Sequence, residues 1–111
     1  MIARHLFSSL LILGTSLAFA NPLPAKVNAM GESSRRNLLG LLVRQAGSQC
    51  PKVQRTFLQA RLPNAAVWNV ACNGKKADFI LVLNDDESNT VRLAACAAHM
   101  ELGVPPCFRK L

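Results

Sequence analysis

Residues 67–83 constrain the fold more than any other stretch, because two strand patterns flank a turn signal there. The Trp-x-Val-x-Cys pattern at 68–72 has the period of two that is typical of a half-buried strand. Asn73-Gly74 follows, a pair that readily adopts the positive φ angles of a tight hairpin turn. Residues 79–83 form an apolar run that suits a central strand. The stretch therefore predicts a β-hairpin.

One amphipathic helix is expected before the hairpin, capped by Ser33 or Ser34 and ended by Gly47. Its apolar residues recur at spacings of three and four on one face, at positions 38, 39, 41, 42 and 46. Gly40 weakens the middle of such a helix, which is tolerable where the helix approaches another element closely.

Two further strand patterns complete a sheet. Residues 53–62 mix apolar side chains with Arg55 and Arg61, which is typical of an edge strand. Residues 90–96 place Val91 and Leu93 on one face of a last strand. This order predicts an α+β fold, in which one N-terminal amphipathic helix packs on a four-stranded antiparallel meander tied by two disulfides.

The four cysteines are the candidates for those disulfides, because the chain looks exported and small exported domains are commonly cross-linked. In the meander, the first three cysteines lie at one end of the sheet, and the first two strands are expected to be neighbours. This arrangement favours Cys50–Cys72 and Cys96–Cys107, although the sequence leaves all three connectivities open.

The start of the chain has the character of a secretory signal peptide. Arg4 precedes an apolar run, and small residues occupy the −3 and −1 positions before a cleavage site after Ala20. The run is shorter than the ~20 residues of a membrane span, which disfavours the alternative of an uncleaved anchor. The sequence thus predicts a signal peptide over 1–20, a flexible arm over 21–30 and one small disulfide-bonded domain over 31–111, located in the periplasm or secreted.

Residues 50–108 resemble a group of small exported proteobacterial proteins that are largely uncharacterised. The resemblance lies in the Trp-x-Val-x-Cys hairpin at 68–72, the following Cys96 and the terminal Cys107-Phe108. These motifs are structural, so the resemblance implies the disulfide framework and an exported location, and it implies no activity.

Few side chains offer catalytic or metal-binding chemistry. His99 is the only histidine after the predicted signal peptide, and a thiol-redox role for Cys96, His99 and Cys107 would require a free or easily reduced cysteine. The acidic loop at 85–89 lacks the glycine and the glutamate of a calcium-binding loop. The sequence therefore predicts no enzymatic activity, no cofactor and no metal site.

A binding role is the remaining class. The formal net charge is +7, but the basic residues are scattered and aromatic residues are few, which argues against a specific nucleic-acid interface and permits weak contact with anionic surfaces. We expect Trp68 in the core under the helix, or alternatively exposed on an open sheet face as a contact for a partner.

The hypothesis is a non-enzymatic domain that binds an unknown protein or envelope component through the free sheet face or the first strand's edge. Electrostatic binding of anionic envelope lipid or polysaccharide, which would involve Arg35, Arg36 and Arg44, is the alternative. The candidate partner-binding residues are Trp68, Arg55, Arg61, Arg35 and Arg36.

Overall fold

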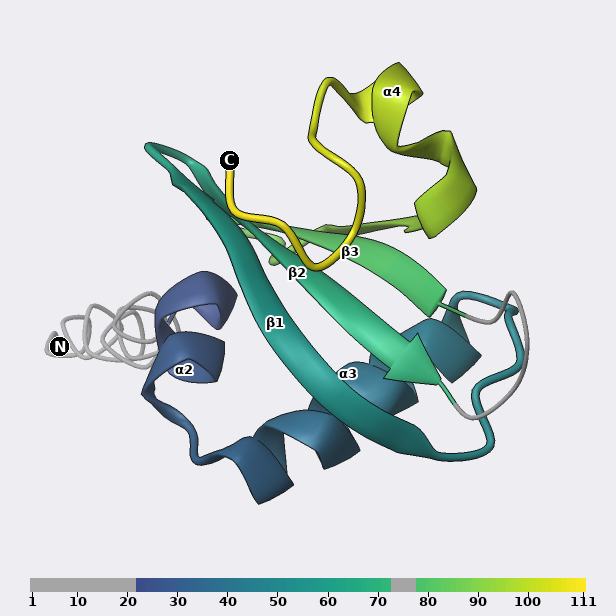
Figure 1. The fold of residues 1–111 in the computed structure, drawn as a ribbon. Helices are drawn as coiled ribbons and strands as arrows, with labels where there is room; N and C mark the ends of the chain where they lie inside the picture. The colour runs from purple at the N-terminus through teal and green to yellow at the C-terminus, as the bar shows by residue number, and fades with distance from the viewer. Residues whose placement is uncertain (1–21, 73–77) are drawn as a thin grey trace, which may run out of the picture.

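The computed structural model describes residues 22–72 and 78–111. The predicted signal peptide at 1–20 and the predicted turn at Asn73-Gly74 lie outside these residues. The elements are α2 (Leu23–Ala29), α3 (Glu32–Gln45), β1 (Val53–Leu62), β2 (Ala65–Cys72), β3 (Asp78–Asn84), β4 (Val91–Ala95), the 3₁₀ helix η2 (Cys96–Ala98) and α4 (His99–Leu102). The strands form one antiparallel sheet in the order β1-β2-β3-β4, which confirms the predicted α+β meander (Figure 1).

The long helix α3 begins two or three residues earlier than the predicted serine cap. Gly31 is its N-cap, so the expectation of Ser33 or Ser34 at that position is wrong. At the other end Gly47 has a φ of +97°, and its N–H donates to the carbonyl of Arg44 at 3.0 Å. A second bond, from the N–H of Ser48 to the carbonyl of Val43, completes a Schellman closure of the helix.

The buried face of α3 is narrower than its leucines suggest. Leu39, Gly40 and Val43 are buried, whereas Leu41 is 42% exposed. Gly40 permits a close approach to the sheet, because a Cβ at this position would lie 2.7 Å from the Cγ2 atom of Val53 in β1. A glycine that costs helix propensity therefore has a packing role.

Residues 22–30, the described part of the predicted flexible arm over 21–30, form a helix and its ends. Leu23–Ala29 form the helix α2, and the side chain of Val27 is fully buried against the sheet. Pro22 and Pro24 suggested a loop, but Pro22 is the N-cap and Pro24 lies in the first turn, where the missing N–H costs no helical hydrogen bond. The helix is too short for a periodic pattern to outweigh the prolines.

The sheet carries two apolar clusters, one on each face. The larger lies under α2 and α3 and joins the buried side chains of those helices to Trp68, Val70, Leu81 and Leu83 of the two central strands. The smaller lies under residues 96–111, which cross the opposite face of the sheet (Figure 1). The expectation of a free sheet face is therefore wrong, because the C-terminal segment covers it.

A bulge in β1 prepares the second face. The register pairs Leu58 with Trp68 and Ala60 with Val67, so Gln59 is an extra residue in β1. Gln59 and Ala60 are both buried there, Gln59 beside Asn69 and Ala60 beside Val67. The bulge thus places a polar side chain where the C-terminal segment needs a partner.

Candidate interaction surface on the rim of the sheet

Trp68 belongs to the core and is not available to a partner. Its side chain lies on the helix-covered face of β2 with a relative exposure of 3%. The guanidinium carbon of Arg35 lies 4.6 Å from the centre of the indole ring, a cation–π geometry. The alternative that Trp68 is an exposed contact is therefore wrong, because the helices cover this face.

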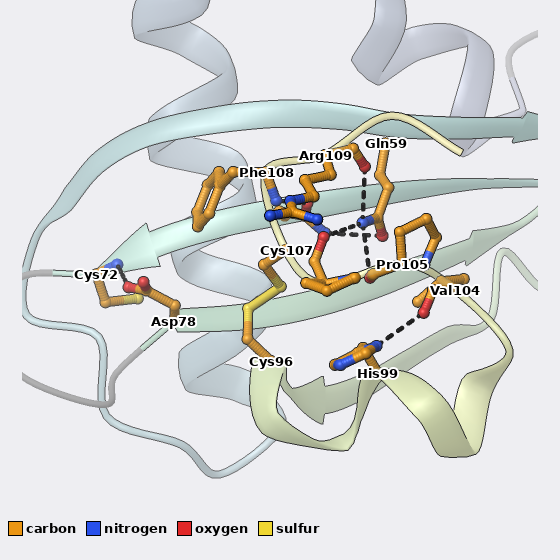
Figure 2. The surroundings of a disulfide bond; sticks show 12 residues. Gln59, Cys72, Asp78, Cys96, His99, Val104, Pro105, Cys107, Phe108 and Arg109 are labelled. Atoms are coloured by element: carbon orange, nitrogen blue, oxygen red, sulfur yellow. Dashed lines mark hydrogen bonds between the residues drawn. A yellow bond between two sulfur atoms is a disulfide. The ribbon is translucent and has the colours of Figure 1, made fainter.

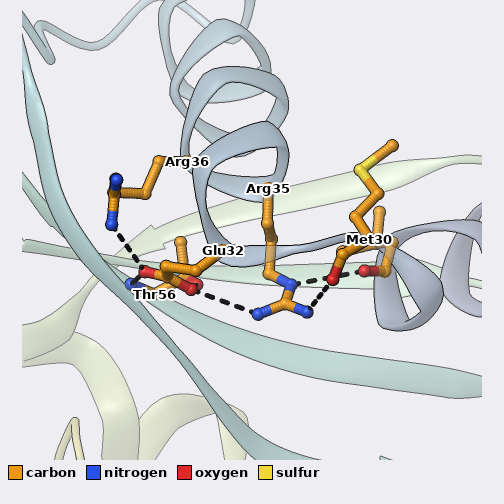
Figure 3. Close-up of polar contacts among 6 residues, drawn as sticks. Met30, Glu32, Arg35, Arg36 and Thr56 are labelled. Carbon is orange, nitrogen blue, oxygen red and sulfur yellow. Dashed lines mark hydrogen bonds and ion pairs between the residues drawn. The ribbon is translucent and has the colours of Figure 1, made fainter.

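Arg35 is likewise committed to internal contacts. Its guanidinium donates to the carbonyls of Val27 and Met30 at the end of α2 and to the carboxylate of Glu32 (Figure 3). Carbonyls at a helix C-terminus lack helical partners, so a cation there is favourable. With its side chain only 16% exposed, Arg35 joins α2 to α3 rather than offering a contact to a partner.

Glu32 connects α3 to β1. Its carboxylate accepts hydrogen bonds from the hydroxyl of Thr56 at 2.7 Å and from the N–H of Thr56 at 3.1 Å (Figure 3). Partial burial acts to raise the pKa of Glu32, but the Thr56 hydrogen bonds and the charges of Arg35 and Arg36 outweigh it and hold the pKa below its ordinary value. Arg36, at 3.5 Å from the same carboxylate, keeps 37% of its side chain exposed.

Both disulfides have the pairing that the meander favoured, Cys50–Cys72 and Cys96–Cys107. All four cysteines are therefore paired and none is a free thiol, so the redox hypothesis now depends on an easily reduced disulfide. His99 directs its ring toward the carbonyl of Val104, with Nδ1 at 2.9 Å from that oxygen (Figure 2). Because a carbonyl only accepts, Nδ1 carries the proton in this contact.

Two buried amides hold the C-terminal segment on its face of the sheet. The side-chain nitrogen of Gln59 donates to the carbonyls of Pro105, Pro106 and Arg109, each at 3.0 Å (Figure 2). Its oxygen accepts from the side chain of Asn69, whose own oxygen accepts from the N–H of Phe108 at 2.7 Å. The irregular segment thus finds partners for its backbone without forming a strand.

Arg55 is exposed on β1 but rests on an aromatic pair. Its guanidinium carbon lies 4.2 Å from the ring centre of Phe108, and Phe108 meets Phe57 edge to face at 6.1 Å. Lys110 lies 5.8 Å from the ring of Phe57 on the same side. Arg61 lies further along β1, and it too is exposed.

A basic hollow lies where α3, the following loop and the start of β1 meet. Its volume is about 460 Å³, and its lining residues are Arg36, Asn37, Arg44, Pro51, Lys52 and Val53. The set contains three cations and no carboxylate. Arg44 is held in place because one of its nitrogens donates to the carbonyl of Cys50 at 3.0 Å. We call Arg36, Arg44 and Lys52 the basic rim.

Of the five partner-binding candidates that the sequence suggested, only Arg36 lines this hollow. Its other two cations, Arg44 and Lys52, were not among those candidates. A sequence signal for this region exists in the distribution of charge. The chain contains no acidic residue between Glu32 and Asp78, whereas the basic rim, Arg55 and Arg61 all fall in this interval. The acidic loop at 85–87 follows β3, at the opposite end of the sheet from the hollow. This interval without acidic residues is the sequence feature that would have indicated the basic side of the domain.

The acidic loop between β3 and β4 is closed by its own hydrogen bonds. The carboxylate of Asp86 accepts from the hydroxyl of Thr90 at 2.6 Å and from the N–H of Thr90 at 3.0 Å. These bonds hold the pKa of Asp86 below its ordinary value. Among the described residues, no group of acidic, histidine or cysteine side chains has the arrangement of a metal site.

Comparisons of the chain with protein-family models, curated proteins and solved structures found no match. The resemblance to small exported proteobacterial proteins therefore stays a prediction. Within residues 22–72 and 78–111, no helix combines the length and the apolar character needed to cross a membrane.

Proposed function

We propose that the chain is a non-enzymatic domain, periplasmic or secreted, that binds an anionic component of the cell envelope through its basic rim. The observation that carries the proposal is the hollow lined by Arg36, Arg44 and Lys52 without a carboxylate. Phosphate and carboxylate groups are the ligands that such a site suits, because guanidinium groups donate to them in pairs. The two disulfides are compatible with an exported location.

The position of the basic rim favours contact with an extended surface. Both sheet faces are covered by the chain's own segments, so a partner meets the domain at its rim. Arg44 is already fixed by the carbonyl of Cys50, which lowers the entropy lost on binding.

Vesicles that contain phosphatidylglycerol provide the first test. Each cation near an anionic membrane contributes about 1 kcal/mol, so the variant R36E/R44E/K52E is expected to lose at least about 100-fold in affinity. Raising the ionic strength is expected to weaken wild-type binding steeply. A parallel titration with a soluble acidic polysaccharide distinguishes a lipid headgroup from a polysaccharide as the source of the anionic groups.

The matched control is K26E/R92E/R109E, which changes net charge equally but leaves the basic rim intact. We expect this variant to retain most of its affinity. Equal losses in both variants would show that net charge alone decides binding, and no binding of either anionic probe would overturn the proposal.

A protein partner is the second candidate, and the cluster formed by Arg55, Phe57, Phe108 and Lys110 favours it. Arginine beside aromatic rings is common at the centre of protein interfaces. If a protein captured from envelope extract binds here, R55A is expected to weaken the purified complex about 10-fold or more. R36E/R44E/K52E is expected to leave this complex unchanged, and the reverse pattern would exclude the cluster.

A further inference from the structure

The two edges of the sheet differ in whether their outward backbone groups are occupied. On β1, the outward N–H of Thr56 donates to Glu32, and the carbonyl of Gln59 accepts from the N–H of Leu111. Two register shifts further disturb this edge. Capping groups and bulges are the devices by which an edge strand avoids pairing with another chain.

The edge of β4 has none of these devices. The N–H of Asn84 donates to the carbonyl of Thr90, so these two residues form a hydrogen-bonded pair of the ladder. In an antiparallel ladder every second residue bonds to the neighbouring strand, and the residues between them direct their N–H and carbonyl groups outward. Arg92 and Ala94 therefore bond to β3, and the N–H groups of Val91, Leu93 and Ala95 point outward. In the described part of the chain, no loop or side chain bonds to these three groups.

We infer that the outer edge of β4 pairs with the same edge of a second copy of this chain. A two-fold antiparallel pairing centred on Leu93 places Leu93 opposite its copy and Val91 opposite Ala95. The outward N–H and carbonyl groups of the two strands then bond to one another. The same register places the strand's one charge, Arg92, opposite Ala94, so like charges do not face each other. The edge is therefore complementary to itself.

The side chains fit this pairing as well as the backbone. Leu93 and Val91 are half-buried against the helix-covered core, and the pairing would extend that apolar cluster across the two copies. The strand spans only Val91–Ala95, so the interface is small and the dimer forms reversibly, at high protein concentration.

The arrangement would make the proposed function bivalent. Because β1 and β4 are the two opposite edges of the sheet, pairing through β4 leaves both basic rims at the far ends of the dimer. Two linked sites bind a surface with repeated anionic groups more tightly than one site does. This consequence rests on the proposed function, whereas the pairing itself does not.

Sedimentation velocity over a wide range of protein concentration, without any anionic probe, tests the pairing. We expect wild type to show a reversible monomer–dimer equilibrium. Ala95→Pro removes one outward N–H per copy, at a residue whose φ of −72° already suits proline. Its dimer is expected to be at least about 10-fold weaker, since two hydrogen bonds are lost by symmetry. Ala95→Ser, which keeps the N–H, is the matched control.

Amide hydrogen exchange gives a readout that needs no variant. Exchange at Leu93 is expected to slow as the protein concentration rises, while exchange at Thr56 stays constant. A protein that is monomeric at every concentration, or a dimer that Ala95→Pro does not weaken, would overturn the pairing. R36E/R44E/K52E is expected to dimerise like wild type, so failure of the anion-binding proposal and failure of the pairing are distinguishable.

Discussion

The two faces of the sheet are closed by different means. Under α2 and α3 the contact is mainly apolar, and Leu39 and Val43 share one buried cluster with Trp68 and Leu81. Under residues 96–111 the apolar cluster is small, and the Gln59–Asn69 amides and a disulfide hold the segment. Neither face of the sheet is left open, which is why the proposed binding site lies at the rim.

The difference follows from the backbone of the covering segments. A helix satisfies its own N–H and carbonyl groups, so α3 needs only an apolar stripe to bind the sheet. Residues 103–111 have no regular structure, and their carbonyls need donors from elsewhere. Gln59 supplies these donors from inside the sheet. We therefore expect the two faces to respond differently to substitution.

The largest effect is expected from Trp68→Ala on the helix-covered face. Removal of a buried aromatic side chain leaves a cavity, and such changes cost about 3–5 kcal/mol in the free energy of unfolding. Denaturant unfolding followed by circular dichroism measures the loss. Trp68→Phe, which keeps a ring beneath Arg35, is expected to cost much less. A loss below about 1 kcal/mol for Trp68→Ala would contradict the placement of this residue in the core.

The next effect is expected from Gln59→Ala on the opposite face. The substitution removes the donor to three part-buried carbonyls and leaves the buried side chain of Asn69 without its acceptor, at a cost of about 1–3 kcal/mol. The change is expected to be local, so amide exchange should accelerate at Phe108 and Leu111 and stay constant in α3. Gln54→Ala, an exposed glutamine of the same strand, is the control. Uniform acceleration across both faces would show that the faces do not open separately.

Gly40→Ala tests how closely α3 approaches the sheet. The added methyl group would overlap Val53, and the cost of this overlap is expected to exceed the gain in helix propensity. The free energy of unfolding is therefore expected to fall by about 1–2 kcal/mol. In a Val53→Ala background the same substitution is expected to become neutral or stabilising. Additive effects of the two changes, measured by a double-mutant cycle, would show that the two residues do not touch.

The smallest effect is expected at Glu32, which joins the helix to β1. Because its pKa is lowered in the folded protein, the carboxylate stabilises the fold above its ordinary pKa of 4.5, and this contribution is lost as the pH falls through the folded value. Glu32→Gln is therefore expected to destabilise the protein at neutral pH, by at most about 1 kcal/mol because the side chain is 40% exposed.

The difference between wild type and Glu32→Gln is expected to shrink below about pH 4.5 and to vanish below the lowered pKa of the folded state. Thr56→Val, which removes the hydroxyl donor, should reduce this pH dependence. Urea unfolding at a series of pH values measures both effects. If Glu32→Gln remained less stable than wild type at low pH, the loss of stability would come from packing and not from the charge of the carboxylate.

The strands, the disulfides and the helix before β1 could be predicted because each has a local signal, such as the alternation at 68–72. The covered second face could not, because it depends on a bulge at Gln59 that shifts one residue to the other side of the strand. Arg35 and Arg36 are neighbours in sequence, yet only the position of α2 shows that Arg35 is enclosed. The helices and strands follow from local sequence patterns. Which residues remain exposed at the rim depends on how segments distant in sequence cover the sheet.

Mapping of an anionic ligand by NMR tests most directly whether binding occurs at the rim. A titration with a short-chain phosphatidylglycerol below its micelle concentration would be followed through the backbone amide shifts. We expect saturable changes concentrated at Arg36, Asn37, Arg44, Lys52 and Val53, with little change in the C-terminal segment. Shifts centred on residues 96–111, or spread evenly over all basic residues, would contradict a binding site at the rim.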